Sequence, residues 1–140
     1  MVSYLLDTNV VSEATKKKPE GRLQDWLAAQ PNEALYLSVI TIGEIRHGLL
    51  LLHDGKKKRA LLEWLGGEIQ TRFAGRILPV DTAVMERWAQ LQAATGKAGR
   101  RLPVMDSLIA ATALSHNLTL ATRNIADFKA ARVALIDPWQ

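Results

Sequence analysis

The chain has 140 residues, a formal net charge of +4 and no cysteine. This length suits one domain, residues 1–140, and the absence of cysteine excludes disulfides, thiolate nucleophiles and thiolate metal sites. No apolar run approaches the roughly 20 residues that a membrane span needs, and no basic segment of a secretion signal opens the chain, so we expect a cytoplasmic protein.

Short apolar segments alternate with helical patterns, which predicts an α/β fold with a parallel sheet covered on both faces. We expect strands at Tyr4–Leu6, Leu35–Ile40, Ile77–Val80, Leu118–Ala121 and Val133–Ile136. We expect helices at Thr8–Ala14, Arg22–Ala29, Ile42–Leu52, Lys57–Arg72, Thr82–Thr95 and Pro103–Ser115, with a loop over Gly96–Arg101.

Acidic and amide residues follow several of the predicted strands. Asp7 ends the first strand, Glu44 lies one helical turn after the second, Asp106 opens a helix, and Asn124 and Asp127 follow the fourth. Ligands of an open parallel sheet collect at the carboxyl ends of its strands, where the strand order reverses. These side chains are therefore expected to converge on one acidic pocket.

Each of these acids has an ordinary explanation when it is taken alone. Asp and Glu are enriched in the first turns of helices, where they bind free N–H groups and oppose the helix dipole, and for Asp106 by itself this is the leading interpretation. It is weaker for the set, because Glu44 and Asp106 both have apolar neighbours. Carboxylates brought together raise one another's pKa unless a cation neutralises them.

A hard divalent cation is the natural partner of such a cluster, because Mg²⁺ and Mn²⁺ prefer oxygen ligands and often join protein carboxylates to substrate phosphates. Thr8, Asn9 and Thr122 are placed to orient the acids. Other catalytic schemes lack their motifs: the histidines show no metal-pair spacing, and there is no nucleophile elbow, P-loop or dinucleotide-binding glycine pattern.

Basic residues occur in runs whose role the sequence leaves open. They are Lys16–Lys18, Lys56–Arg59 and Arg100–Arg101. Such runs either contact a phosphate backbone or form solvated helix ends and loops.

Five segments together resemble one known family: "LLDTNVVSE", "YLSVITIGEIRHGLLLL", "GRILPVD", "MDSLIAATALSHNLTLATRN" and the closing "DPW". In this order they resemble the PIN-domain ribonucleases, specifically VapC toxins of the FitB-like branch, over nearly the whole chain. The resemblance implies a three-layer sandwich with a central parallel sheet flanked by helices. It also implies Mg²⁺-dependent RNA cleavage, with Mn²⁺ as a possible substitute, inhibited by a VapB-like antitoxin.

The family's metal-site acids correspond to Asp7, Glu44 and Asp106. The fourth position departs from the pattern, because Asn124 stands where FitB-like members often carry Asp, and Asp127 one turn on is a candidate for the missing charge. With a bound Mg²⁺, a metal-activated water would attack the phosphate in line, leaving a 5'-phosphate and a 3'-hydroxyl.

The resemblance further implies a homodimer, a larger toxin–antitoxin complex, and contact with operator DNA only through the antitoxin. Two other functions stay open at this point. A metal-dependent phosphatase also suits an acid after the first strand, although the haloacid-dehalogenase pattern places a second Asp where this chain has Asn9. A catalytically silent PIN-like partner of a DNA-binding antitoxin is the other alternative.

Overall fold

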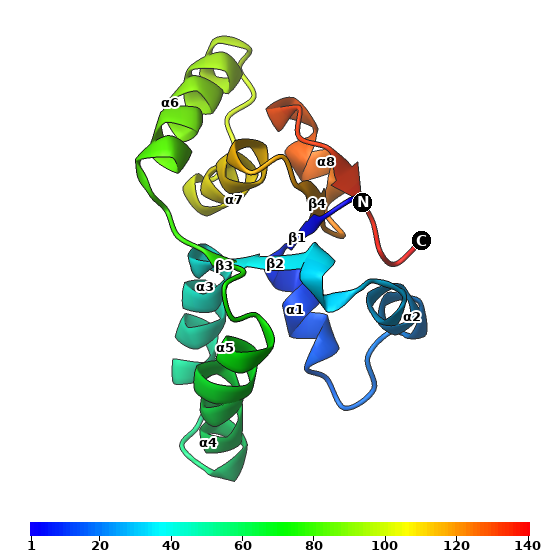
Figure 1. The fold of residues 1–140 in the computed structure, drawn as a ribbon. Coiled ribbons are helices and arrows are strands. Elements are labelled where there is room, and N and C mark those ends of the chain that lie inside the picture. The colour runs from blue at the N-terminus through cyan, green and yellow to red at the C-terminus, as the bar shows by residue number, and fades with distance from the viewer.

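The computed structural model describes residues 1–140, and its centre is a five-stranded parallel sheet with the strand order β3-β2-β1-β4-β5 (Figure 1). The strands are β1 (Tyr4–Leu6), β2 (Leu35–Ser38), β3 (Ile77–Leu78), β4 (Thr119–Ala121) and β5 (Leu135–Ile136). In β1, Tyr4 is in register with Leu35 of β2 on one side and with Thr119 of β4 on the other. The predicted parallel sheet is confirmed.

The helices cover both faces of this sheet. They are α1 (Thr8–Ala14), α2 (Gly21–Ala29), α3 (Val39–Leu50), α4 (Lys56–Glu63), α5 (Ile69–Arg72), α6 (Thr82–Lys97), α7 (Val104–Ser115) and α8 (Ile125–Phe128). In Figure 1 the helices α6, α7 and α8 lie above the strands, whereas α1 to α5 lie below them. None of these helices combines the length and the apolar character needed to cross a lipid bilayer.

Alternation along the strands divides the core into two layers, because successive strand side chains point to opposite faces. Leu5 and Leu120 belong to the apolar cluster shared with α6, α7 and α8. Leu6 and Ala121, their chain neighbours, belong to the cluster shared with α1, α2 and α5. This arrangement is the predicted three-layer sandwich, and the central strands are apolar on both faces because both are covered.

Several elements differ from the sequence prediction, and three of these differences concern helical segments. The second strand ends at Ser38 instead of Ile40, because the Ser38 hydroxyl accepts a hydrogen bond from Ile40 N (3.0 Å) and so caps α3. The expected continuous helix Lys57–Arg72 is interrupted by a π-helical turn, Trp64–Glu68. A short helix, α8, forms after β4 where the prediction had none.

The strand order identifies one edge of the sheet as the expected ligand-binding site. The chain runs outward from β1 to β2 and β3, and then returns to the other side of β1 to form β4 and β5. The order therefore reverses between β1 and β4, and the carboxyl ends of these two strands form the crevice where such sheets bind ligands. Asp7 and Thr122 are the residues that directly follow these strands.

Candidate active site

Asp7 is fixed at the carboxyl end of β1 by three hydrogen bonds. Its backbone N–H donates to Ala121 O of β4 (2.9 Å). Its carboxylate accepts from Thr8 N at Oδ1 (2.8 Å), which caps α1, and from the Thr122 hydroxyl at Oδ2 (2.7 Å). The residue is only 5% exposed. A buried carboxylate is tolerated here because donors from two segments satisfy it.

Glu44 joins the site from α3. The Thr8 hydroxyl donates to Glu44 Oε1 (2.7 Å), and the buried Thr41 hydroxyl lies 3.2 Å from the same Thr8 oxygen. Thr8 therefore links the first turn of α1 to α3, because its backbone N–H donates to Asp7 and its hydroxyl donates to Glu44. The sequence analysis missed Thr41; its place three residues before Glu44, on the adjoining turn of one helix, is a signal that could have found it.

Asp106 lies in the first turn of α7, and its side chain is half-buried. The ordinary role of an acid in this position is a helix cap, but the N-terminus of α7 has no side-chain cap hydrogen bond. Asp106 also takes no part in a salt bridge. Its neighbour Ser107 is fully buried, accepts from Trp88 Nε1 (2.9 Å) and donates to Val104 O (2.6 Å), and so ties α7 to α6.

Asn124 and Asp127 belong to the segment that begins α8, and both are exposed. Asn124 N donates to Thr122 Oγ1 (3.1 Å), the same oxygen that donates to Asp7. The charge of Asp127 contributes to the raised pKa of Asp106. The structure thus brings this segment to the site. The backbone N–H of Asn124 donates to Thr122, and the charge of Asp127 acts on Asp106.

Burial and mutual repulsion raise the pKa values of two of the acids. The pKa of Asp7 lies above its ordinary value of 3.8, mainly because of burial and further because of the Glu44 charge, while the hydrogen bonds from Thr122 and Thr8 oppose the rise. Burial is also the largest cause of the raised pKa of Asp106, followed by the charges of Asp7, Glu44 and Asp127. Four acidic side chains therefore act on one another electrostatically.

No cation of the protein neutralises this cluster. The two salt bridges of the structure join Lys16 to Glu13 and Lys58 to Asp54, outside the site. Arg123, beside the site in sequence, lies over the Trp139 ring with its guanidinium carbon 5.2 Å from the ring centre. The acids keep an unbalanced negative charge, which is the donor chemistry that suits a hard divalent ion.

The distances between the acids set how such an ion would be held. No three His, Cys, Asp or Glu side chains are close enough to ligate one ion together. Mg²⁺ does not require that arrangement, because it usually keeps several waters and binds one or two carboxylates directly. The residues present therefore fit a partly hydrated Mg²⁺, and the assignment of Asp7, Glu44 and Asp106 as its ligands stays a prediction.

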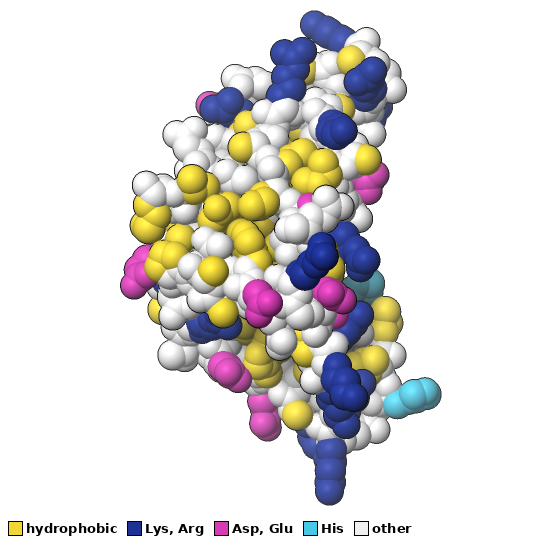
Figure 2. Space-filling model, turned by 90° about the vertical axis from the view of Figure 1, so that its right-hand side faces the viewer, with side chains coloured by type: hydrophobic (Ala, Val, Ile, Leu, Met, Phe, Trp, Pro, Cys, Tyr) yellow, Lys and Arg dark blue, Asp and Glu magenta, His cyan; other side chains and the backbone are white.

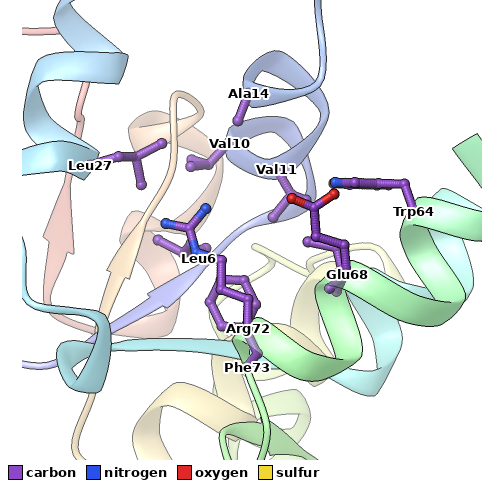
Figure 3. A pocket seen from close by; sticks show the side chains of 10 residues that line it. Leu6, Val10, Val11, Ala14, Leu27, Trp64, Glu68, Arg72 and Phe73 are labelled. Carbon is purple, nitrogen blue, oxygen red and sulfur yellow. The ribbon is translucent and has the colours of Figure 1, made fainter.

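An apolar cavity of about 230 Å³ lies beneath the sheet and is separate from the acids. Figure 3 shows Val10, Val11 and Ala14 of α1 beside it. Trp64, which precedes α5, and Phe73, which directly follows α5, also line the cavity. None of the site acids lines this cavity. One helix, α1, thus presents its first turn to the acidic site and its apolar side to the cavity.

Comparison with known proteins agrees with this geometry. Residues 4–134 match the PIN domain family. The chain is 46% identical to Toxin FitB of Neisseria gonorrhoeae over 96% of this chain and 97% of that protein. It is 40% identical to VapC ribonuclease Y4jK of Sinorhizobium fredii over 97% of both chains.

A solved structure extends the similarity to three dimensions. The structure of FitAB bound to an IR36 DNA fragment contains a chain that is 44% identical and has a TM-score of 0.92, with 98% of this chain and 96% of that chain covered. The match spans the sheet, both helical layers and the segments that carry the acids. The chain therefore belongs to the PIN-domain family and, within it, to the VapC toxins that include FitB.

Proposed function

We propose that this protein is the toxin of a type II toxin–antitoxin system and acts in the cytoplasm as an Mg²⁺-dependent endoribonuclease. The observation that carries the proposal is the cluster of Asp7, Glu44 and Asp106 at the reversal point of the sheet, because burial and their mutual charges raise two pKa values and no basic side chain balances them. Membership in the VapC family supplies the reaction class.

The three proposed metal ligands differ in how many hydrogen bonds the protein donates to them. Two donors hold the Asp7 carboxylate and one hydroxyl holds Glu44, whereas Asp106 has no hydrogen bond that lowers its pKa. Asp106 is therefore the carboxylate most available to a cation, and Thr8 and Thr122 keep the other two in position. A bound Mg²⁺ would lower the pKa of a coordinated water and stabilise the phosphate charge during in-line attack.

The antitoxin is the proposed inhibitor and the link to operator DNA, as part of a complex that also contains a toxin homodimer. FitB, the relative at 46% identity, is itself named a toxin, and the FitAB structure contains DNA. The acidic site suits an antitoxin arginine, because a guanidinium pairs with carboxylates in a bidentate geometry and would compete with Mg²⁺. The apolar cavity beside α1 suits an apolar side chain of the same partner.

The direct test is cleavage of a single-stranded RNA by the purified chain in Mg²⁺, in Mn²⁺ and in EDTA. We expect cleavage in both metals, none in EDTA, and products with 5'-phosphate and 3'-hydroxyl ends. Asp7→Asn and Glu44→Gln should abolish cleavage without loss of fold, as judged by circular dichroism.

Two results would contradict the proposal. Cleavage that persists in EDTA would remove the metal from the reaction. Antitoxin binding by a chain that never cuts RNA in either metal would favour the catalytically silent partner instead.

A further inference from the structure

Two lysine runs that are far apart in the sequence meet at one groove. Lys16 and Lys17 follow α1, and Lys57 lies in the first turn of α4. These three lysines, with Leu52 and Leu61, line a groove of about 620 Å³. Figure 2 shows Lys and Arg side chains at the lower end of the molecule, the end that holds α4 in Figure 1, and others at its upper end. We call this feature the basic groove.

The lysines of the two runs differ in their availability. Lys58 is not available to bind a further anion, because its ammonium pairs with Asp54 (2.9 Å) and donates to Leu50 O (3.2 Å). Its side chain is only 16% exposed. Lys16 pairs with Glu13 (3.0 Å). Lys17 and Lys57 form no salt bridge and are exposed. The basic groove thus has an uncompensated cation from each of its two walls.

The basic groove and the acidic site lie at opposite ends of the same pair of helices. α1 and α3 are in contact. Near their N-terminal ends the Thr8 hydroxyl, in the first turn of α1, donates to Glu44 Oε1, in the second turn of α3 (2.7 Å). Past their last turns Thr15 and Leu52 line the groove. Seven residues of α1 at 1.5 Å each separate the two ends by about 10 Å. A single RNA strand covers this distance with a few nucleotides.

We propose that the basic groove holds the phosphate backbone of single-stranded RNA a few nucleotides from the scissile phosphate. This inference rests on the proposed ribonuclease function. A polyanion that enters a site of uncompensated carboxylates needs a cationic contact nearby, and the groove supplies one along the α1–α3 seam.

The test compares two doubly neutralised variants of the full chain. Lys17→Gln with Lys57→Gln removes the two free cations of the basic groove. Arg100→Gln with Lys129→Gln is the matched control, because both residues line a second cavity that α1 and α3 do not touch. Binding of a fluorescent single-stranded RNA is measured in EDTA at several salt concentrations, so that no cleavage occurs.

We expect the slope of log affinity against log salt to be less steep in the groove variant by about 1.4, which is 0.7 for each lost phosphate contact. The control variant should keep the wild-type slope. In Mg²⁺, the groove variant should cleave a long RNA several-fold more slowly and a dinucleotide at the wild-type rate, because a dinucleotide has only the scissile phosphate and none to place in the groove.

Three outcomes would overturn the inference. An unchanged slope, or an equal loss in the control, would mean that this groove does not hold the RNA. Wild-type RNA binding together with lost antitoxin binding would assign the groove to the antitoxin. Failure of the ribonuclease proposal is distinguishable, because the wild-type chain would then cleave neither RNA, while the slopes in EDTA would still report on the groove.

Discussion

Asp106→Asn should have opposite effects on activity and on stability. The substitution keeps the size of the side chain and removes one negative charge from a cluster that no cation of the protein balances. RNA cleavage in Mg²⁺ should fall, because a charge that helps to hold the metal is lost. Stability without metal should rise, because Asp7, Glu44 and Asp127 no longer repel a fourth carboxylate.

The size of each effect follows from the exposure of the site. Loss of one group that stabilises transition-state charge costs on the order of 10²–10³ in rate. The Asp106 side chain is partly exposed, so solvent screening limits the gain in the free energy of unfolding to about 0.5–1 kcal/mol. For a chain of this length, such a gain corresponds to about 3 °C in Tm.

The stability difference should depend on pH with a definite sign. The folded state holds the Asp106 proton more tightly than the unfolded state, because its pKa is raised above 3.8. Wild-type stability from this group is therefore fully present below the unfolded pKa and is lost as pH rises through the folded pKa. The Tm advantage of Asp106→Asn should vanish at a pH below 3.8 and reach its maximum at neutral pH.

Thermal unfolding followed by circular dichroism in EDTA, together with cleavage of single-stranded RNA in Mg²⁺, measures both effects. Asp25→Asn is the control, because Asp25 is exposed on α2, forms no salt bridge and is not among the acids that raise the pKa of Asp106. It should leave cleavage unchanged and should not raise Tm. An Asp106→Asn protein that is less stable than wild type at neutral pH in EDTA, or that cleaves RNA at the wild-type rate, would refute the argument.

Three further substitutions probe the surroundings of the site. Thr122→Val removes the buried hydroxyl that donates to Asp7 Oδ2 (2.7 Å), and it should lower the free energy of unfolding by about 1–3 kcal/mol and shift the acid limb of the pH–rate profile to higher pH; unchanged stability would show that the bond contributes little. Asn124→Asp should lower the Mg²⁺ concentration for half-maximal cleavage, because Asn124 N donates to the Thr122 hydroxyl that holds Asp7, and Asp127→Asn should raise it, because the Asp127 charge acts on Asp106; identical metal titrations would place both side chains outside the site. Ala14→Phe should partly fill the 230 Å³ apolar cavity, weaken antitoxin binding more than tenfold by calorimetry and leave RNA cleavage intact; undiminished binding would locate the antitoxin elsewhere.

The sequence was sufficient for features that depend on residues near one another in the chain. The helix Thr8–Ala14 has the predicted bounds, because Asp7 is a strong N-cap at the end of an apolar strand. The sandwich followed from apolar strands between helical patterns. The sequence also predicts that Asp7, Glu44 and Asp106 share one metal site, and that assignment stays a prediction.

Other features were decided by tertiary contacts, because they join segments whose distance in space no local pattern records. Thr8 and Glu44 are 36 residues apart and share a hydrogen bond only because α3 packs against α1. Asp106 could have been an ordinary helix cap, and only the structure shows that it lacks a cap bond and faces the charges of three other acids. Likewise Lys17 and Lys57 become two walls of one groove, whereas Lys58 is withdrawn into a pair with Asp54. Local propensity determines which residues form each element, but the free energy of packing those elements determines which side chains meet.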